Sequence, residues 1–388
     1  MMRPLLDPRY YGMDDLLRRP YTTATPLGSA GEYVWADAPQ GWGFSGCVHF
    51  GSGGPAGGRA PVTLTLTADS EPVSVGDAIY RPSHVTLNGR HEPSGLQITE
   101  DKFITSDDVI VSVISLRNPS EDSVAFQVES AWGVPQGEIE LPMGTLWVRR
   151  EGPPGDDLVQ RLPSGARRTL VFAVAVAPSR EEAQYRVAYW RNRENPVRAQ
   201  AAAYQNWFDD NAPRFDCSDP WLTKLWYHRW AVMRRLRGES AEEIAAVREI
   251  SSMKSETWLQ GVAEYARTQF EAGDFTNPCE TDPAPSNREL REPTLNRFIA
   301  ECLLGVALRG DTLRMLPALP PASEGGWSHF CLENLRSAER LLTVVWDDPS
   351  DLSFDAYQDG DMGLTIYADG RRIYHQEDLE PFDLELPL

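Results

Sequence analysis

The chain has 388 residues, 41% of them apolar and 10% aromatic, which is enough for two or three folded domains with ordinary cores. Its 57 acidic residues outnumber the 37 Lys and Arg residues, and the formal charge is -20. Such a charge repels phosphate backbones and anionic lipid surfaces. We therefore expect no nucleic-acid partner and no membrane partner.

Targeting and metal-binding signals are absent from the sequence. Residues 1–21 contain no apolar run of signal-peptide length, and no later run is long enough to cross a bilayer, which predicts a cytoplasmic protein. The five cysteines are widely spaced and the histidines show no metal-ligand spacing. No P-loop, dinucleotide fingerprint or GxSxG motif is present. We expect reduced thiols, no metal and no cofactor.

Up to about residue 178 the sequence has the pattern of β-strands. Period-two alternation and β-branched residues mark strands at 62–67, 109–116, 124–128 and 170–176, with turn formers between them. Repeated short strands without intervening helices predict an antiparallel sandwich. The Gly-rich stretch 51–58 has no strand before it and no helix after it, so we interpret it as a loop.

Helical signals begin at Ser179, which has capping-box spacing to Glu182. Further helices are expected at 196–208, from Ser218-Asp219-Pro220 onward, from a second capping box at Ser240, and at 256–271. The clearest helical pattern is 295–309, whose apolar stripe is closed by Gly310. The stripe consists of Leu295, Phe298, Ile299, Cys302, Leu303 and Val306.

Strands return after Gly310, at 341–346, 364–367 and 372–374, and Asp369-Gly370 favours a tight hairpin turn between the last two. The acidic stretch that starts at Glu377 is expected to pair as an edge strand. The predicted class is α+β, mainly β, in three parts. These are an N-terminal antiparallel β-sandwich (1–178), a shortened helical layer (179–310) and a C-terminal β segment (311–388) packed on the sandwich or the helices.

Three stretches carry a resemblance to a known family: 215–230, 310–320 with Trp327 and Phe330, and 342–347 with 363–370. They resemble the entry into the first barrel helix, the exit from the barrel and the closing strands of bacterial six-hairpin glycoside hydrolases. That superfamily includes trehalases, mannosyl-oligosaccharide glucosidases and mannosylglycerate hydrolases. The resemblance implies a carbohydrate-related function and an N-terminal β domain.

The helical middle is too short for the barrel of that family. An (α/α)6 barrel has twelve helices, whereas residues 179–310 hold only about five or six of average length. No acid or base motif of the family matches this sequence residue by residue. No catalytic residue is therefore carried over from the resemblance.

Candidate catalytic residues come instead from an acidic, loop-like cluster near the end of the helical region. Glycoside hydrolysis requires two carboxyl groups that face each other across the scissile bond. The candidates are Glu256, beside Trp258, and Asp274, Glu280 and Asp282. In so acidic a chain, a solvated loop is the more common explanation of such a cluster, by about three to one.

Candidate substrate-binding residues are aromatic or flank aromatics. Trp35 and Trp42 lie in an aromatic and glycine-rich stretch that is suited to a pocket on the sandwich, although core positions are about twice as common for such residues. In the cluster 226–230, one helical face packs Trp226, Trp230 and Met233 inward. This leaves Tyr227, His228 and Arg229, together with Trp258, for a ligand or partner.

Three functions remain open. The first is binding of a glycoside, with hydrolysis or rearrangement, in a cleft between sandwich and helices. The second is a cofactor-free cyclase or isomerase that folds a bulky small molecule inside a deep apolar pocket lined by tryptophans. The third is a carbohydrate-binding remnant without catalysis. A wet, carboxylate-rich pocket would favour the sugar-related functions. The apolar surface left by the missing barrel predicts a homodimer.

Overall fold

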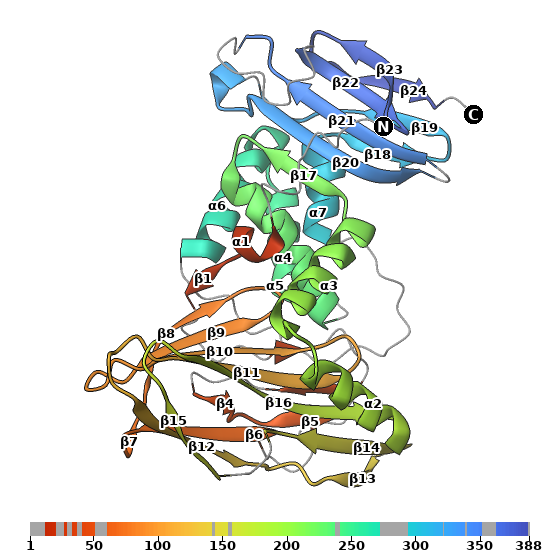
Figure 1. The fold of residues 1–388 in the computed structure, drawn as a ribbon. Coiled ribbons are helices and arrows are strands. Elements are labelled where there is room, and N and C mark those ends of the chain that lie inside the picture. Colours follow the sequence, from red (N-terminus) through yellow and green to blue (C-terminus); the bar gives the residue numbers. More distant parts are fainter. Residues whose placement is uncertain are drawn as a thin grey trace. The chain divides into compact units, whose positions relative to one another are not determined.

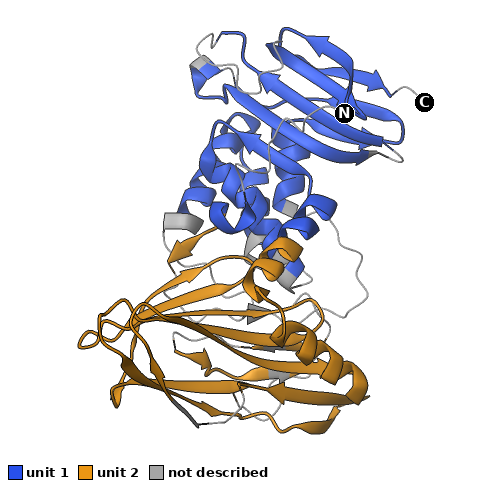
Figure 2. Cartoon of the chain, viewed as in Figure 1, with its two compact units in different colours: residues 1–16, 205–281, 288–388 blue, residues 17–204, 282–287 orange. Residues whose placement is uncertain are grey.

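The computed structural model describes residues 12–20, 27–28, 33–36, 41–50, 60–141, 144–153, 157–236, 241–271, 294–320, 322–337, 340–350 and 362–386. Within these ranges the chain forms two compact units (Figures 1 and 2). Unit 1 contains 12–16 and the described residues after 204, and unit 2 contains the described residues from 17 to 204. The α+β class, mainly β, is confirmed.

Unit 2 is a sandwich of antiparallel sheets (Figure 1). Its larger sheet has the order β1-β8-β9-β10-β11-β16-β14-β13. The bounds are β1 Arg19–Pro20, β8 Val75–Tyr80, β9 Val85–Arg90, β10 Gln97–Ile104, β11 Val109–Arg117, β13 Gly137–Leu141, β14 Gly144–Glu151 and β16 Arg167–Ala177.

The facing sheet has the order β15-β12-β6-β4, with β7 also paired to β6. Its bounds are β4 Gly43–Phe44, β6 Val62–Ala68, β7 Glu71–Pro72, β12 Val124–Ala131 and β15 Asp157–Leu162, and a small third sheet contains β2 Leu27–Gly28, β3 Val34–Ala36 and β5 Val48–Phe50. All four strands predicted before residue 178 are confirmed. The Gly-rich stretch 51–58 lies outside the described residues.

A charged network lies inside the sandwich core. Glu100 and Lys102, both 0% exposed, point inward from β10 between apolar residues of the two sheets. The Lys102 ammonium donates to the carbonyls of Gly41 and Gly43, at 2.9 Å each. The Glu100 carboxylate accepts from the Gly43 amide at 2.9 Å and from the Ser112 hydroxyl at 2.6 Å. The network therefore fixes the backbone that leads into β4.

Two helices follow the sandwich in sequence. In α2 (Arg180–Arg191) the Ser179 hydroxyl accepts from the Glu182 amide at 3.2 Å, so the predicted N-cap is confirmed. Helix α2 packs on β16 and β14 within unit 2, although the sequence analysis assigned it to the helical part. Helix α3 (Pro196–Asn211) begins at the expected proline and continues past the boundary between the units at residue 204.

The helices of unit 1 form a short layer. They are α1 Met13–Leu16, the end of α3, α4 Pro220–Leu236, α5 Ala241–Ser251, η1 Ser255–Thr257, α6 Trp258–Glu271, α7 Thr294–Phe298 and the π-helix η3 Ile299–Leu303. Helix α4 begins as predicted, with the Asp219 carboxylate accepting from the Trp221 amide at 2.9 Å. Helices α4, α5, α6 and α7 pack on one another.

Two antiparallel sheets complete unit 1 (Figure 1). The larger has the order β17-β20-β21-β22-β23 and the smaller the order β18-β19-β24. The Asp369-Gly370 turn and the terminal edge strand are confirmed, because β24 pairs at the edge of the smaller sheet. The bounds are β17 Arg214–Cys217, β18 Val306–Arg309, β19 Thr312–Met315, β20 His329–Ser337, β21 Arg340–Asp347, β22 Gly363–Ala368, β23 Arg371–Gln376 and β24 Phe382–Glu385, with the single-turn helix η4 Ala322–Glu324 before β20.

The helix predicted at 295–309 is wrong beyond Leu303. The chain forms α7 and then the π-helix η3, and Val306 begins strand β18, which pairs with β19. Gly305 has φ +71°, and a Cβ atom there would lie 2.0 Å from the carbonyl carbon of Leu316. The approach of this second segment ends the helix, and Gly310 becomes a hairpin turn.

Cys47, Cys217, Cys302 and Cys331 are free thiols, and Cys279 lies outside the described residues. No helix within the described ranges is both long and apolar enough to cross a membrane.

Candidate functional site

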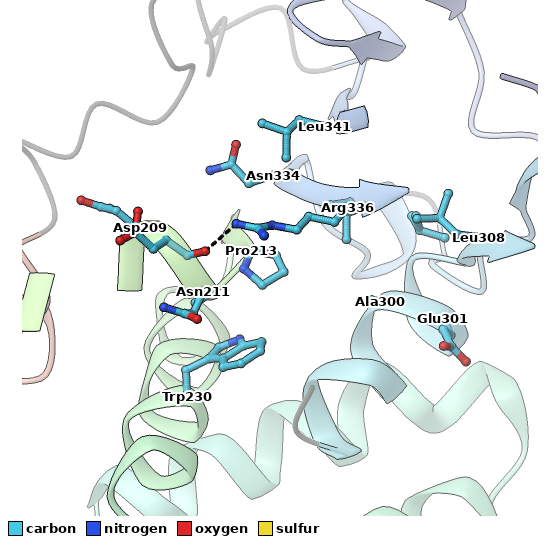
Figure 3. A pocket seen from close by; sticks show the side chains of 14 residues that line it. Asp209, Asn211, Pro213, Trp230, Ala300, Glu301, Leu308, Asn334, Arg336 and Leu341 are labelled. Atoms are coloured by element: carbon cyan, nitrogen blue, oxygen red, sulfur yellow. Dashed lines mark hydrogen bonds between the residues drawn. The ribbon is translucent and has the colours of Figure 1, made fainter. Parts of the chain in front are cut away.

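The described residues of unit 1 line a cavity of about 390 Å³ that is open to solvent on one side, and its volume is within the range of roughly 300–1,000 Å³ typical of small-ligand pockets. Its walls come from the end of α3, from α4, from η3 and β18, and from β20 and β21 (Figure 3). The lining residues are Asp209, Asp210, Asn211, Ala212, Pro213, Trp230, Ala300, Glu301, Val306, Leu308, Asn334, Leu335, Arg336 and Leu341.

Trp230 supplies the aromatic wall of the cavity. It belongs to α4, is only 4% exposed and packs edge-to-face against Trp207 with ring centroids 6.5 Å apart. Its indole Nε1 is buried and has no hydrogen-bond acceptor among the described residues. One turn earlier on the same helix, Trp226 donates its indole N–H to the carbonyl of Pro213 at 2.9 Å. A buried indole N–H normally has a hydrogen-bond acceptor, so the N–H of Trp230 is an unsatisfied donor within the described residues.

Asn334 lies at a β-bulge in β20. The register with β21 shifts between Leu332 and Leu335, and Asn334 has φ +65°. The left-handed region is uncommon for a residue other than glycine. Strained backbone of this kind clusters at ligand sites, and Asn334 lines the cavity.

The π-helix η3 forms another wall. The amide of Leu304 donates to the carbonyl of Ile299 at 2.9 Å, five residues back, which is the spacing of a π-helix. Its residues Ala300 and Glu301 line the cavity, and the Glu301 side chain is exposed. Single π turns within helices are frequent at functional sites. Thus both irregular elements next to the cavity place a polar side chain on its wall.

The charged residues that line the cavity differ in their hydrogen-bond partners. The Asp209 carboxylate accepts from Gln205 Nε2 and from Arg214 Nη2, both at 3.2 Å. The Arg336 guanidinium donates to the backbone carbonyl of Asp210 at 2.7 Å. Figure 3 shows Asp209 and Glu301 on opposite sides of the cavity. The lining of the cavity therefore includes carboxylates from two elements, α3 and η3.

The remaining wall is apolar. Val306 and Leu308 come from β18, Leu335 from β20 and Leu341 from β21, and Leu341 is 46% exposed. The cavity is thus amphipathic, with an indole and aliphatic side chains beside carboxylates, amides and one guanidinium. Such a surface suits a ligand that has an apolar face and several hydroxyl groups at its edge.

Comparisons with known proteins give no family for this chain. No family model matches it, and no curated protein matches it in sequence. Solved structures that match part of this chain include a protein described as a putative kojibiose phosphorylase from the human microbiome, with 11% identity, a TM-score of 0.40, and coverage of 60% of this chain and 40% of that one. A sialidase also matches, with 11% identity, a TM-score of 0.30, and coverage of 81% of this chain and 62% of that one. The chain spans less than two thirds of either, and membership of the six-hairpin glycosidases stays a prediction.

The predicted aromatic residues near the N-terminus belong to unit 2. Trp42 is 7% exposed, lies in the sandwich core and donates its indole N–H to the Val73 carbonyl at 2.7 Å. The backbone of Trp35 belongs to β3, and its side chain is outside the described part of the structure.

The predicted residues of α4 are mostly buried. The Tyr227 hydroxyl accepts from the Phe215 amide at 3.0 Å, and burial raises the pKa of Tyr227. Arg229 is buried and donates to the Tyr265 hydroxyl at 2.5 Å, while His228 is half-buried. Trp258 packs edge-to-face against Phe298 at 5.4 Å.

Of the four predicted carboxylates, the structure describes Glu256 alone. Glu256 is exposed in η1, and Asp274, Glu280 and Asp282 lie outside the described residues. None of the described candidates lines the cavity. Their catalytic and binding roles stay predictions.

Sequence reasoning missed Asp209, Glu301 and Asn334. A signal for Asn334 was present, because alternation breaks in Cys331-Leu-Glu-Asn-Leu335, where two polar residues are consecutive. A break of this kind in a strand indicates a bulge. Strand β20 itself was not predicted, so the break in alternation could not be interpreted as a bulge within a strand.

Proposed function

We propose that unit 1 binds a glycoside in the cavity between its helices and strands β18, β20 and β21. The observation that carries the proposal is the buried indole N–H of Trp230, which lacks an acceptor in the described structure and belongs to an amphipathic cavity. A sugar hydroxyl that reaches the edge of this indole is a suitable acceptor for the N–H.

The composition of the cavity supports a sugar over a bulky apolar molecule. Three carboxylates, two amides and one guanidinium share the lining with a single tryptophan. A cyclase or isomerase for a polycyclic substrate would use a deep apolar pocket with few polar groups. Binding of a glycoside is therefore favoured over the cyclase alternative.

Hydrolysis would add a second requirement, namely two carboxyl groups that face each other across the scissile bond. Asp209 and Glu301 come from opposite walls of the cavity (Figure 3). The presence of carboxylates from two elements in one lining supports hydrolysis as the finer form of the proposal. Turnover of nitrophenyl glycosides by the purified protein tests it, and binding without turnover would support a carbohydrate-binding remnant.

The proposal is tested by thermal shift, since a ligand of the folded state raises the melting temperature. The purified protein is screened against methyl glycosides of glucose, galactose and mannose, alongside polycyclic apolar compounds. We expect stabilisation by at least one sugar and by none of the apolar compounds. Stabilisation by the apolar compounds alone would overturn the proposal.

Two tryptophan variants locate the binding site. Trp230→Phe removes a donor that has no acceptor within the described residues, whereas Trp226→Phe removes the bond to Pro213. We expect W230F to weaken sugar binding at least tenfold. We expect W226F to bind the sugar like the wild type and to be less stable by about 1–3 kcal/mol, because it leaves a buried carbonyl without its partner. Equal binding by wild type and W230F would contradict the site.

A further inference from the structure

We propose that Asn334 is the specificity-determining residue of this cavity, and that its side-chain amide binds two neighbouring hydroxyl groups on the ligand ring. The inference rests on the proposed glycoside binding and extends it to a residue and a ligand feature. Three observations on the same residue carry it. They are its left-handed backbone, its side-chain amide without a hydrogen bond within the described structure, and its place in the lining of the cavity.

The backbone of Asn334 is held in a left-handed conformation, φ +65°, by the bulge between Leu332 and Leu335. Glycine adopts this conformation without steric cost, whereas asparagine only tolerates it. Asparagine is one of the few residues other than glycine that enter this region readily. The bulge therefore places an amide-bearing side chain on the cavity wall, where glycine would place none.

The side-chain amide of Asn334 makes no hydrogen bond to the protein within the described structure, although the residue is half-buried and lines the cavity. Figure 3 shows it above Pro213, beside Arg336. By contrast, Asn211 in the same lining donates to the Trp207 carbonyl at 2.8 Å. The amide of Asn334 is thus available to a ligand.

The hydrogen-bonding groups of the amide indicate which feature of a ligand it would bind. One oxygen accepts and the adjacent nitrogen donates, and a pair of neighbouring hydroxyls presents the complementary donor and acceptor. The bulge fixes the backbone that carries this amide, which reduces the entropy lost on binding. The ligand class is therefore a pyranose or related polyol with a vicinal diol.

The test compares Asn334→Gly with a matched control, Ser70→Gly. Ser70 is also left-handed, φ +70°, but lies in the turn between β6 and β7 of unit 2. Both variants relieve the same backbone strain, so neither is expected to lower the melting temperature. Titration calorimetry uses whichever methyl glycoside stabilises the wild type, together with its monodeoxy analogues.

We expect N334G to bind the parent glycoside at least tenfold more weakly than the wild type, and S70G to bind it equally. One monodeoxy analogue should bind the wild type more weakly than the parent does, and N334G should not distinguish the two. Equal affinity of N334G and wild type, or equal discrimination among the analogues, would overturn the role of Asn334 and leave glycoside binding intact. Failure of every sugar to bind the wild type would overturn both.

Discussion

Lys102 and Glu100 show how a buried pair of charges can serve backbone geometry. Burial raises the pKa of Glu100 and lowers that of Lys102, and each charge opposes the shift of the other. The hydrogen bonds of the pair go to Gly41, Gly43 and Ser112. The bonds to Gly41 and Gly43 satisfy main-chain groups that would otherwise be buried without partners.

Lys102→Met is expected to lower the free energy of unfolding by about 3–5 kcal/mol, because it leaves the Glu100 carboxylate buried without its cation. The carbonyls of Gly41 and Gly43 would also lose their donor. Urea denaturation measures the change. The control, Lys254→Met at an exposed position, should stay within about 0.5 kcal/mol of the wild type. A similar loss in both variants would contradict this account.

The helical spacing of Trp226 and Trp230 predicts that both are buried, and this is confirmed. The sequence could not predict that the indole N–H of Trp226 has an acceptor whereas that of Trp230 has none among the described residues. The acceptor for Trp226 is the carbonyl of Pro213, whose position depends on how the turn before β17 packs against α4. Hydrophobic periodicity identifies a buried face, but it does not identify the partner of a polar atom on that face.

At the scale of elements, the predictions held where a local signal determines the structure. The Ser179 cap, the Asp219 cap and the Asp369-Gly370 turn depend on residues within a few positions of one another. The strand β18 is different, because its first residue, Val306, fits the apolar stripe of a helix equally well. Pairing with β19 decides between the two structures, and a short apolar run does not reveal that pairing.

Gly305→Ala tests this explanation of where the helix ends. A Cβ atom would lie 2.0 Å from the Leu316 carbonyl carbon, in addition to the strain of φ +71°. We expect a loss of about 3 kcal/mol or more, of which roughly 1–2 comes from the left-handed backbone and the rest from the clash. Gly310→Ala is the control, since its φ is +65° with no atom within 4 Å. Chemical denaturation of both variants should show the larger loss at Gly305.

At the scale of the whole molecule, the carboxylate predicted from the sequence and the carboxylate that lines the cavity belong to different elements, η1 and η3. Glu256 was predicted from its aromatic and acidic neighbours, and it lies exposed in η1. Glu301 lines the cavity, and only the three-dimensional structure brings it beside Trp230 and Asn334. A cavity assembled from segments about 100 residues apart leaves no local pattern in the sequence.

Glu256→Gln and Glu301→Gln form a matched pair for this comparison. We expect E301Q to weaken binding of the stabilising glycoside and to lower any turnover of nitrophenyl glycosides. We expect E256Q to match the wild type in both assays, because Glu256 is not among the residues that line the cavity. The reverse result would favour the acidic cluster predicted from the sequence. Calorimetry and a colorimetric assay give the two readouts.

Unit 1 is discontinuous in sequence, and this affects how it is made. The Met13 amide donates to Gln205 Oε1 at 3.0 Å, which joins residues 192 positions apart. During synthesis the sandwich is complete once Tyr204 has emerged from the ribosome, whereas the unit that contains Met13 must wait for β24. Prior folding of the sandwich replaces a long flexible loop with a short link, so it lowers the entropic cost of closing unit 1 around its N-terminal segment.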